Sequence, residues 1–187
     1  MLWVFFVMAA VLVLFVVGIY NGLVRLKVQS ENAWADIEVQ LKRRYDLIPN
    51  LIETVKGYAG HEKQTLETVI SARNRAMATT SPTHKAEAES VLAQSLKSLF
   101  ALAEAYPQLR AVESFTQFQS SLDQIEEAVQ NARRYYNAVV RDLNTKIQEF
   151  PSNFVAHFFN FKTREFFEIT EAVERTVPKV SFEQAPR

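Results

Sequence analysis

The sequence predicts an all-α membrane protein, in which one N-terminal transmembrane helix is followed by an antiparallel up-down bundle of long helices. Three observations lead to this fold class. The first 24 residues carry no charged side chain, a later segment repeats apolar residues at helical spacing, and only four of the 187 residues are glycine. So few glycines disfavour a turn-rich β fold and a glycine-rich phosphate loop. We therefore expect an anchor at residues 1–24, a helical bundle domain at 25–177 and a loosely attached tail at 178–187.

The anchor begins with an almost continuously apolar run from Leu2 to Ile19, with Trp3 and Tyr20 at its two ends. At about 1.5 Å per residue this run covers roughly 27 Å, close to the thickness of a bilayer core. Aromatic rings favour the membrane–water interfaces. A cleaved signal peptide would have a basic residue before the run and a small-residue cleavage site, and Val16-Val17-Gly18 is a poor one. A buried soluble helix this apolar is rare at a chain terminus, so we favour a retained anchor.

Charge around the anchor predicts its orientation. Arg25 and Lys27 follow the apolar run at once, and no basic side chain precedes it. The positive-inside rule then places the N-terminus outside and the helical domain in the cytoplasm. We expect a single-pass protein of the cell membrane.

Two glycines of the anchor could serve helix association. Gly18 and Gly22 form a Gly-x-x-x-Gly pair, and glycines four residues apart let two helix backbones approach closely in lipid. This makes the pair a candidate for anchor dimerisation. The alternative is that Gly22 already lies at the interface, where glycine is tolerated without a packing role.

Three helices are predicted between the anchor and residue 106. The first continues from the anchor and is interrupted at Pro49, because the residue before a proline disfavours α geometry. The second runs to about Ala78, where Thr79-Thr80-Ser81-Pro82 is the clearest loop signal. The third ends near Tyr106-Pro107. The first helix carries an apolar stripe formed by Leu26, Ala33, Ile37, Leu41 and Ile48.

The fourth helix is predicted to be the longest. No Pro or Gly interrupts Leu109 to Phe150, so one helix of about 40 residues is possible. Its apolar steps alternate three and four, which favours packing in a left-handed bundle. Short connections favour antiparallel neighbours. The seam consists of Phe115, Phe118, Leu122, Ile125, Val129, Ala132, Tyr136, Val139 and Leu143.

Two arginine pairs are candidate interaction residues. Arg43-Arg44 and Arg133-Arg134 each precede a tyrosine, and paired guanidinium groups suit an anion or a lipid headgroup. The alternative is ion pairing on the helix surface, which we favour because charged residues usually mark a solvated face. The acidic neighbours available for it are Glu38, Asp46, Glu126 and Glu127.

A phenylalanine-rich segment follows the fourth helix. Its rings could form a surface for a partner or a membrane, with Phe154, Phe158 and Phe159 as candidates, but we favour the cap of a core because buried rings stabilise strongly. The up-down order returns this segment to the emerging anchor, near residues 21–26. The seven rings are Phe150, Phe154, Phe158, Phe159, Phe161, Phe166 and Phe167.

No metal, cofactor or catalytic site is predicted. The chain has no cysteine, so thiolate metal sites and cysteine nucleophiles are excluded. His61-Glu62 begins like a zinc metalloprotease signature, but Thr65 stands where the second histidine is needed, and His84 and His157 lie far away. Twenty-one basic residues balance 21 acidic ones, which argues against nucleic-acid binding.

Several stretches together resemble the LemA family. The stretch from Asn32 to Tyr58 looks like the family's hallmark, and the resemblance runs from about Tyr20 to Phe182. It implies a bacterial membrane protein with an N-terminal anchor and an antiparallel helical domain, in a family without established enzymatic activity or agreed biochemical function. The other matching stretches are Tyr20–Val24, His61-Glu62, Ala132–Asn137, Phe150–Asn153 and Pro178–Phe182.

We therefore expect a membrane-anchored, non-catalytic scaffold or interaction module, whose partners are the lipid bilayer and another membrane protein or a second copy. No small-molecule substrate is identified. One alternative is a lipid-binding or membrane-remodelling protein that uses the arginine pairs and the phenylalanine-rich segment. Another is an enzyme with a site formed by Arg44, Glu53, Tyr58 and Arg134. A convergent pocket with perturbed carboxylates would favour the enzyme, and a basic face near the anchor would favour lipid binding.

Overall fold

The computed structural model describes residues 1–168, which form helices and one extended segment and contain no β-strand. This confirms the predicted all-α class. Residues 161–168 form the extended segment, which we call the strap. The predicted tail at 178–187 and the end of the predicted domain lie outside the described residues. The helices are α1 (Leu2–Ala59), α2 (Lys63–Ala78), α3 (Pro82–Glu104), α4 (Pro107–Arg110), α5 (Glu113–Gln148) and α6 (Ser152–Phe158).

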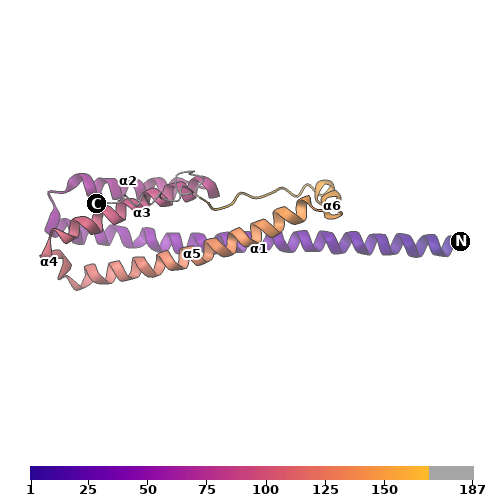
Figure 1. Ribbon diagram of the computed structural model, residues 1–187, viewed down its shortest axis with the longest axis horizontal. Coiled ribbons are helices and arrows are strands. Elements are labelled where there is room, and N and C mark those ends of the chain that lie inside the picture. Colours follow the sequence, from indigo (N-terminus) through magenta and orange to yellow (C-terminus); the bar gives the residue numbers. More distant parts are fainter. Residues whose placement is uncertain (169–187) are drawn as a thin grey trace, which may run out of the picture.

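Helix α1 is continuous over 58 residues, so the interruption predicted at Pro49 is wrong (Figure 1). A proline inside a helix removes one backbone hydrogen bond and costs about 3 kcal/mol. Ile48 and Leu51 on either side of it are fully buried on one face of the helix, and this packing outweighs the cost. The chain turns instead at Gly60, where a side-chain Cβ would lie only 2.9 Å from the carbonyl oxygen of Lys56.

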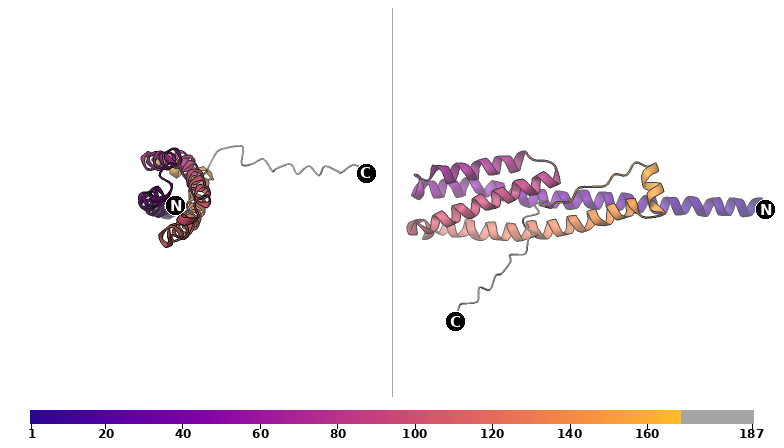
Figure 2. Two further views of the ribbon diagram at one scale, coloured as in Figure 1. Left: turned by 90° about the vertical axis from the view of Figure 1, so that its left-hand side faces the viewer. Right: turned by 45° about the horizontal axis from the view of Figure 1, so that its top comes forward.

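Successive long helices run in opposite directions, and α5 follows α1 over most of its own length (Figure 1). Helices α2 and α3 form a hairpin that covers this pair at the end far from the N-terminus, as the turned view in Figure 2 also shows. Short helix α4 joins α3 to α5 at that far end. The larger of two apolar cores contains residues of α1, α2, α3, α4 and α5.

The predicted seam of α5 faces this core from Phe115 to Tyr136, and Leu143 near its end belongs to a second, smaller core. Seven of its nine residues are buried, while Phe118 and Ala132 are half-buried. The helix has 36 residues instead of about 40, because Pro107 starts the separate helix α4 and Pro151 follows closely after its C-terminal end. The spacing of the apolar residues therefore predicted the buried face correctly.

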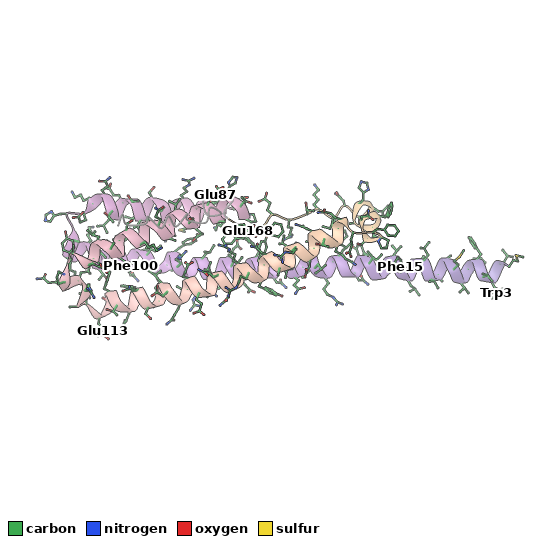
Figure 3. The ribbon with its side chains drawn as sticks, viewed as in Figure 1. Trp3, Phe15, Glu87, Phe100, Glu113 and Glu168 are labelled. Carbon is green, nitrogen blue, oxygen red and sulfur yellow. The ribbon has the colours of Figure 1, made fainter. Side chains whose placement is uncertain are left out.

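The first part of α1 extends beyond every other element, and Figure 3 shows Trp3 and Phe15 projecting from it. Its most apolar 18-residue window has a mean hydropathy of 3.0, and none of that window is buried. Among residues 1–168 this is the one helix long and apolar enough to span a membrane. The segment is thus not buried against the other described residues of the chain, and it has the features of a membrane anchor.

Candidate functional site

The candidate site lies around Tyr20 and Leu23, just after the apolar segment of α1 ends. Leu23 of α1 packs with Leu143 of α5 and with Val155 and Ala156 of α6 in a small separate core. The ring of Tyr20 contacts the ring of Phe159, with centroids 4.7 Å apart. The phenylalanine-rich segment therefore lies beside residues 21–26, as predicted. We call residues 20–31 of α1, helix α6 and residues 159–168 the collar.

Helix α6 is fixed to the end of α5 by a buried hydroxyl group. Ser152 is fully buried, and its Oγ lies 2.6 Å from the carbonyl oxygen of Lys146 and 3.0 Å from that of Glu149. The last carbonyls of a helix have no partner within the helix. The serine hydroxyl supplies one, and so holds the start of α6 against the end of α5.

Most of the phenylalanine rings face outward. The exposed fractions are 79% for Phe150, 67% for Phe154, 81% for Phe158 and 46% for Phe159, whereas Phe167 is 2% exposed. The favoured interpretation of a core cap is therefore wrong for these first four rings. A helix of seven residues can bury only one face, and Val155 and Ala156 occupy it. The three candidate rings at 154, 158 and 159 form part of the surface.

Two asparagines of α5 hold the strap. The side-chain amide of Asn137 donates to the carbonyl of Phe167 (3.2 Å) and accepts from its backbone N–H (2.9 Å). Asn144 makes the same two bonds with Arg164, at 2.9 and 2.8 Å. Seven helical residues rise about 10.5 Å, and three extended residues span about 10 Å. The heptad spacing of the asparagines therefore matches the strap's backbone and fixes its register.

Further contacts tie the strap to three elements. The ring of Phe167 packs on Trp34 of α1, with centroids 5.7 Å apart, and the hydroxyl of Tyr136 donates to the carbonyl of Glu165 (2.9 Å). Ser81, just before α3, donates its hydroxyl to the Glu165 carboxylate (2.8 Å). Burial raises the pKa of Tyr136, and Arg164 nearby lowers it in part. Sequence reasoning missed the strap, although two asparagines seven residues apart, each directly after a seam residue of α5, were a signal for it.

A cleft of about 560 Å³ opens between α1 and the first residues of the strap. Tyr20, Phe159 and Phe161 contribute aromatic rings to its lining, and Lys27, Lys162, Arg164 and Glu31 contribute charge. Arg164 pairs with Glu31 at 2.6 Å. The cleft therefore combines an aromatic edge with an excess of basic groups.

Arg44 lies in the core and not on the surface. Its exposed fraction is 5%, and its guanidinium pairs with Glu89 of α3 at 3.1 Å and with Glu126 of α5. Surface ion pairing is thus wrong for Arg44, although Glu126 was among the expected partners. The reason is spacing: Leu41, Arg44 and Ile48 continue the three-and-four seam of α1, so the arginine fills a core position.

The groups around Arg44 form a buried polar network. The Tyr45 hydroxyl donates to Glu89, and Lys85 lies 5.7 Å from the centre of the Tyr45 ring. Burial raises the pKa of Tyr45 well above its usual range, and the hydrogen bond to Glu89 adds to this shift. Lys85 and Glu89 lie on the buried face of α3, just as Arg44 lies on the buried face of α1. The network therefore fixes how α1 and α3 pack against each other.

The remaining arginines do not assemble a common anion site. Arg43 is exposed and bonds to Gln40 at 3.3 Å, Arg133 is half-buried, and Arg134 is exposed and bonds to Asn131. They lie on the outer surface, whereas Arg44 is enclosed between helices. The two pairs therefore lie in different environments, although their sequences are similar.

The residues of the enzyme alternative are not brought together. Glu53 is exposed beside Lys56 at 3.9 Å, and Tyr58 is 46% exposed. Within residues 1–168, neither of them hydrogen-bonds to Arg44 or Arg134, and no group of three His, Asp or Glu side chains could hold a metal ion.

The glycine pair of the anchor faces open space. No heavy atom lies within 4 Å of a Cβ built at Gly18 or Gly22. A second helix has room to approach here, and anchor dimerisation stays a prediction.

The chain is similar in sequence to several known proteins. Protein LemA of Metamycoplasma hominis is 27% identical over 173 residues, which cover 91% of this chain and 78% of that protein. Magnetosome proteins MamQ 1 and MamQ 2 of Paramagnetospirillum magneticum are each 31% identical over 74 residues, covering 40% of this chain and 27% of theirs. The profile of the LemA family matches residues 33–182. Because that match spans most of the chain, the protein belongs to the LemA family.

Proposed function

We propose that this protein is a single-pass, non-catalytic membrane scaffold, in which α1 both crosses the bilayer and forms the central helix of an antiparallel bundle. The observation that carries the proposal is the continuity of α1 from Leu2 to Ala59. With residues 2–19 in the bilayer, the residues from Tyr20 to Ala59 extend about 60 Å beyond it. The far end of the bundle is then held at a fixed distance from the membrane.

The packing around α1 favours a rigid connection between the anchor and the bundle over a flexible tether. Helix α5 packs along α1, and the small core around Leu23 continues this packing down to the base of the apolar segment. A flexible tether would have a linker rich in Gly, Ser or Pro at this point. Residues 20–31 of α1 are helical and bonded to the strap through Glu31. The anchor and the domain therefore move as one body.

The collar supports close contact with lipid as a second role. The ring of Phe159 contacts Tyr20 at the end of the apolar run. Phe158 packs against Phe159, and Phe150 and Phe154 are further exposed rings of the same segment. Aromatic rings favour the interface between lipid and water. Helix α6 then rests on the membrane surface beside the anchor and helps to hold the bundle upright.

Orientation follows from charge. Arg25 and Lys27 support a cytoplasmic bundle by the positive-inside rule. The open face at Gly18 and Gly22 offers a route to self-association, and a second membrane protein is the alternative partner. The surface residues Arg43, Arg133 and Arg134 then face the cytoplasm.

Alkaline carbonate extraction of cell membranes tests the insertion. The full chain is expected to stay in the membrane pellet, whereas a chain that begins at residue 25 is expected in the supernatant. Extraction of the full chain, or removal of its N-terminal segment by a signal peptidase, would contradict the proposal. A reporter that is active only in the cytoplasm, fused after Arg187, tests the orientation and should be active.

A further inference from the structure

The cleft of the collar has a basic lining that the scaffold function does not explain. Its volume is about 560 Å³, and it is lined by Lys27 of α1 and by Lys162 and Arg164, with Glu31 as its one carboxylate. Within residues 1–168, neither lysine forms an ion pair, whereas Arg164 is bound to Glu31 at 2.6 Å. The carboxylate therefore neutralises the arginine, and the two lysines remain available to an anion.

The cleft is polar at one end and aromatic at the other. Tyr20 lies next to the apolar segment of α1, and its ring contacts Phe159 and Phe161 at centroid distances of 4.7 and 5.8 Å. Glu31 lies three turns further along the same helix. A ligand with a charged end and an apolar end fits this order, with its apolar end toward the apolar segment of α1.

Lys27 lies within reach of the level expected for lipid phosphate groups. The Cα of Lys27 is eight residues beyond Ile19, or about 12 Å along the helix. Side chains of a helix tilt toward its N-terminus, and a lysine stem can carry its ammonium group several Å back along an apolar surface. The polar layer of each leaflet is roughly 5–8 Å thick. The ammonium group of Lys27 can therefore reach this layer.

We propose that the cleft binds the phosphate headgroup of an anionic phospholipid, taken from the leaflet in which the anchor ends; this rests on the proposed membrane insertion. Lys27 and Lys162 contact the phosphate oxygens from α1 and from the strap. Tyr20, Phe159 and Phe161 pack against the glycerol and the first part of the acyl chains. The lipid thereby bridges the anchor and the strap.

Native mass spectrometry of the full chain in nanodiscs tests the site. The discs contain phosphatidylcholine with or without phosphatidylglycerol, and the retained lipids are counted. The wild-type chain is expected to retain phosphatidylglycerol at least tenfold over its share in the disc. Each of Lys27→Gln and Lys162→Gln should lower this preference about fivefold, as expected for one cation at an anionic surface.

Matched controls separate this site from general charge. Lys56→Gln with Lys63→Gln removes one cation near the far end of α1 and one at the start of α2, and should change the preference less than twofold. The charge-preserving pair Lys27→Arg and Lys162→Arg should retain it. The lipid site would be overturned if the control variant lost as much of the preference as Lys27→Gln and Lys162→Gln do. It would also be overturned if the wild type showed no preference. Full displacement of the lipid by inorganic phosphate at millimolar concentration would identify a free-anion site and also overturn it.

The same samples distinguish this inference from the scaffold proposal. A chain that inserts into phosphatidylcholine discs without preferring phosphatidylglycerol leaves the insertion intact and removes only the lipid site. A chain that does not insert into either disc contradicts the proposed insertion itself.

Discussion

Helices α1 and α5 run through both halves of the bundle, but different elements pack against them in each half. In the far half, the α2–α3 hairpin supplies apolar stripes that close the core around them (Figure 2). In the half near the apolar segment, the strap replaces that hairpin and is held mainly by its backbone. An extended chain has too few side chains on one face to form a helix-like stripe, so hydrogen bonds from α5 hold it instead.

The two halves also bury polar groups in different ways. The far half encloses an ionic network around Arg44, whereas the near half uses the neutral amides of Asn137 and Asn144. A buried charge that loses its partner costs far more than a neutral amide that loses one hydrogen bond. The comparison thus predicts that mutations in the far half affect global stability, while mutations in the near half act locally.

The largest effect is expected for Arg44→Met. It leaves the Glu89 carboxylate buried without its cation, and removal of one partner of a buried ion pair typically costs about 3–5 kcal/mol. The exposed neighbour is the control, since Arg43→Met should change stability by no more than about 0.5 kcal/mol. Thermal melts of the full chain in detergent measure both. Equal melting temperatures for the two variants would show that the network does not stabilise the far half.

Asn137→Ala should have a smaller and more local effect. It removes two hydrogen bonds to Phe167 and leaves buried backbone groups unpaired, at a cost of about 1–3 kcal/mol. Hydrogen exchange should rise in the strap and remain unchanged in α2 and α3. The exposed Asn131→Ala on the same helix is the control. A rise in exchange throughout the bundle would contradict the division into two halves.

Alkaline pH should weaken the far half through Tyr45. Its pKa is raised above the usual value of 10.0 by burial and by Glu89, so the folded state favours the neutral phenol. Its contribution to stability is complete below pH 10 and is lost as the pH rises further, by up to about 1.4 kcal/mol per pH unit. Urea unfolding between pH 8 and 11 should therefore show a shallower decline for Tyr45→Phe. An identical decline of stability with pH in both proteins would show that ionisation of Tyr45 does not weaken the far half.

Phe158→Ser is expected to leave stability nearly unchanged. The ring is 81% exposed, and exposed substitutions typically change the free energy of unfolding by about 0.5 kcal/mol or less. Its loss should instead weaken contact of α6 with lipid, which can be measured as reduced protection of residues 152–158 from exchange in vesicles relative to detergent. A melting temperature lowered by many degrees would place this ring in a core.

Periodicity in the sequence predicted the fold wherever one residue class repeats along one helix. The apolar segment and the seam from Phe115 to Leu143 follow from such patterns. The return of the phenylalanine-rich segment to residues 21–26 follows from the up-down order of the helices. The break at Pro49 was wrong because a local preference was outweighed by packing on both sides of it. A proline's local cost is visible in sequence, whereas the packing that offsets it depends on other helices.

The site could be predicted only in part. The exposed rings of the segment were candidates, but burial of Arg44 was missed because the apolar stripe was followed only through apolar residues. The gap of seven between Leu41 and Ile48 marked a core position filled by a charge. The strap was not predicted because it depends on hydrogen bonds between distant segments, which leave no periodic pattern in residues 161–168.

Depth measurement in a bilayer tests the central claim most directly. The chain has no cysteine, so single cysteines at Phe158 and His61 can carry a fluorophore in vesicles that contain nitroxide-labelled lipids. We predict strong quenching at residue 158, because in the proposed arrangement α6 rests on the membrane surface. We predict none at residue 61, about 60 Å away along α1. Equal quenching at both positions, or quenching at residue 61 alone, would contradict an upright scaffold held by a continuous α1.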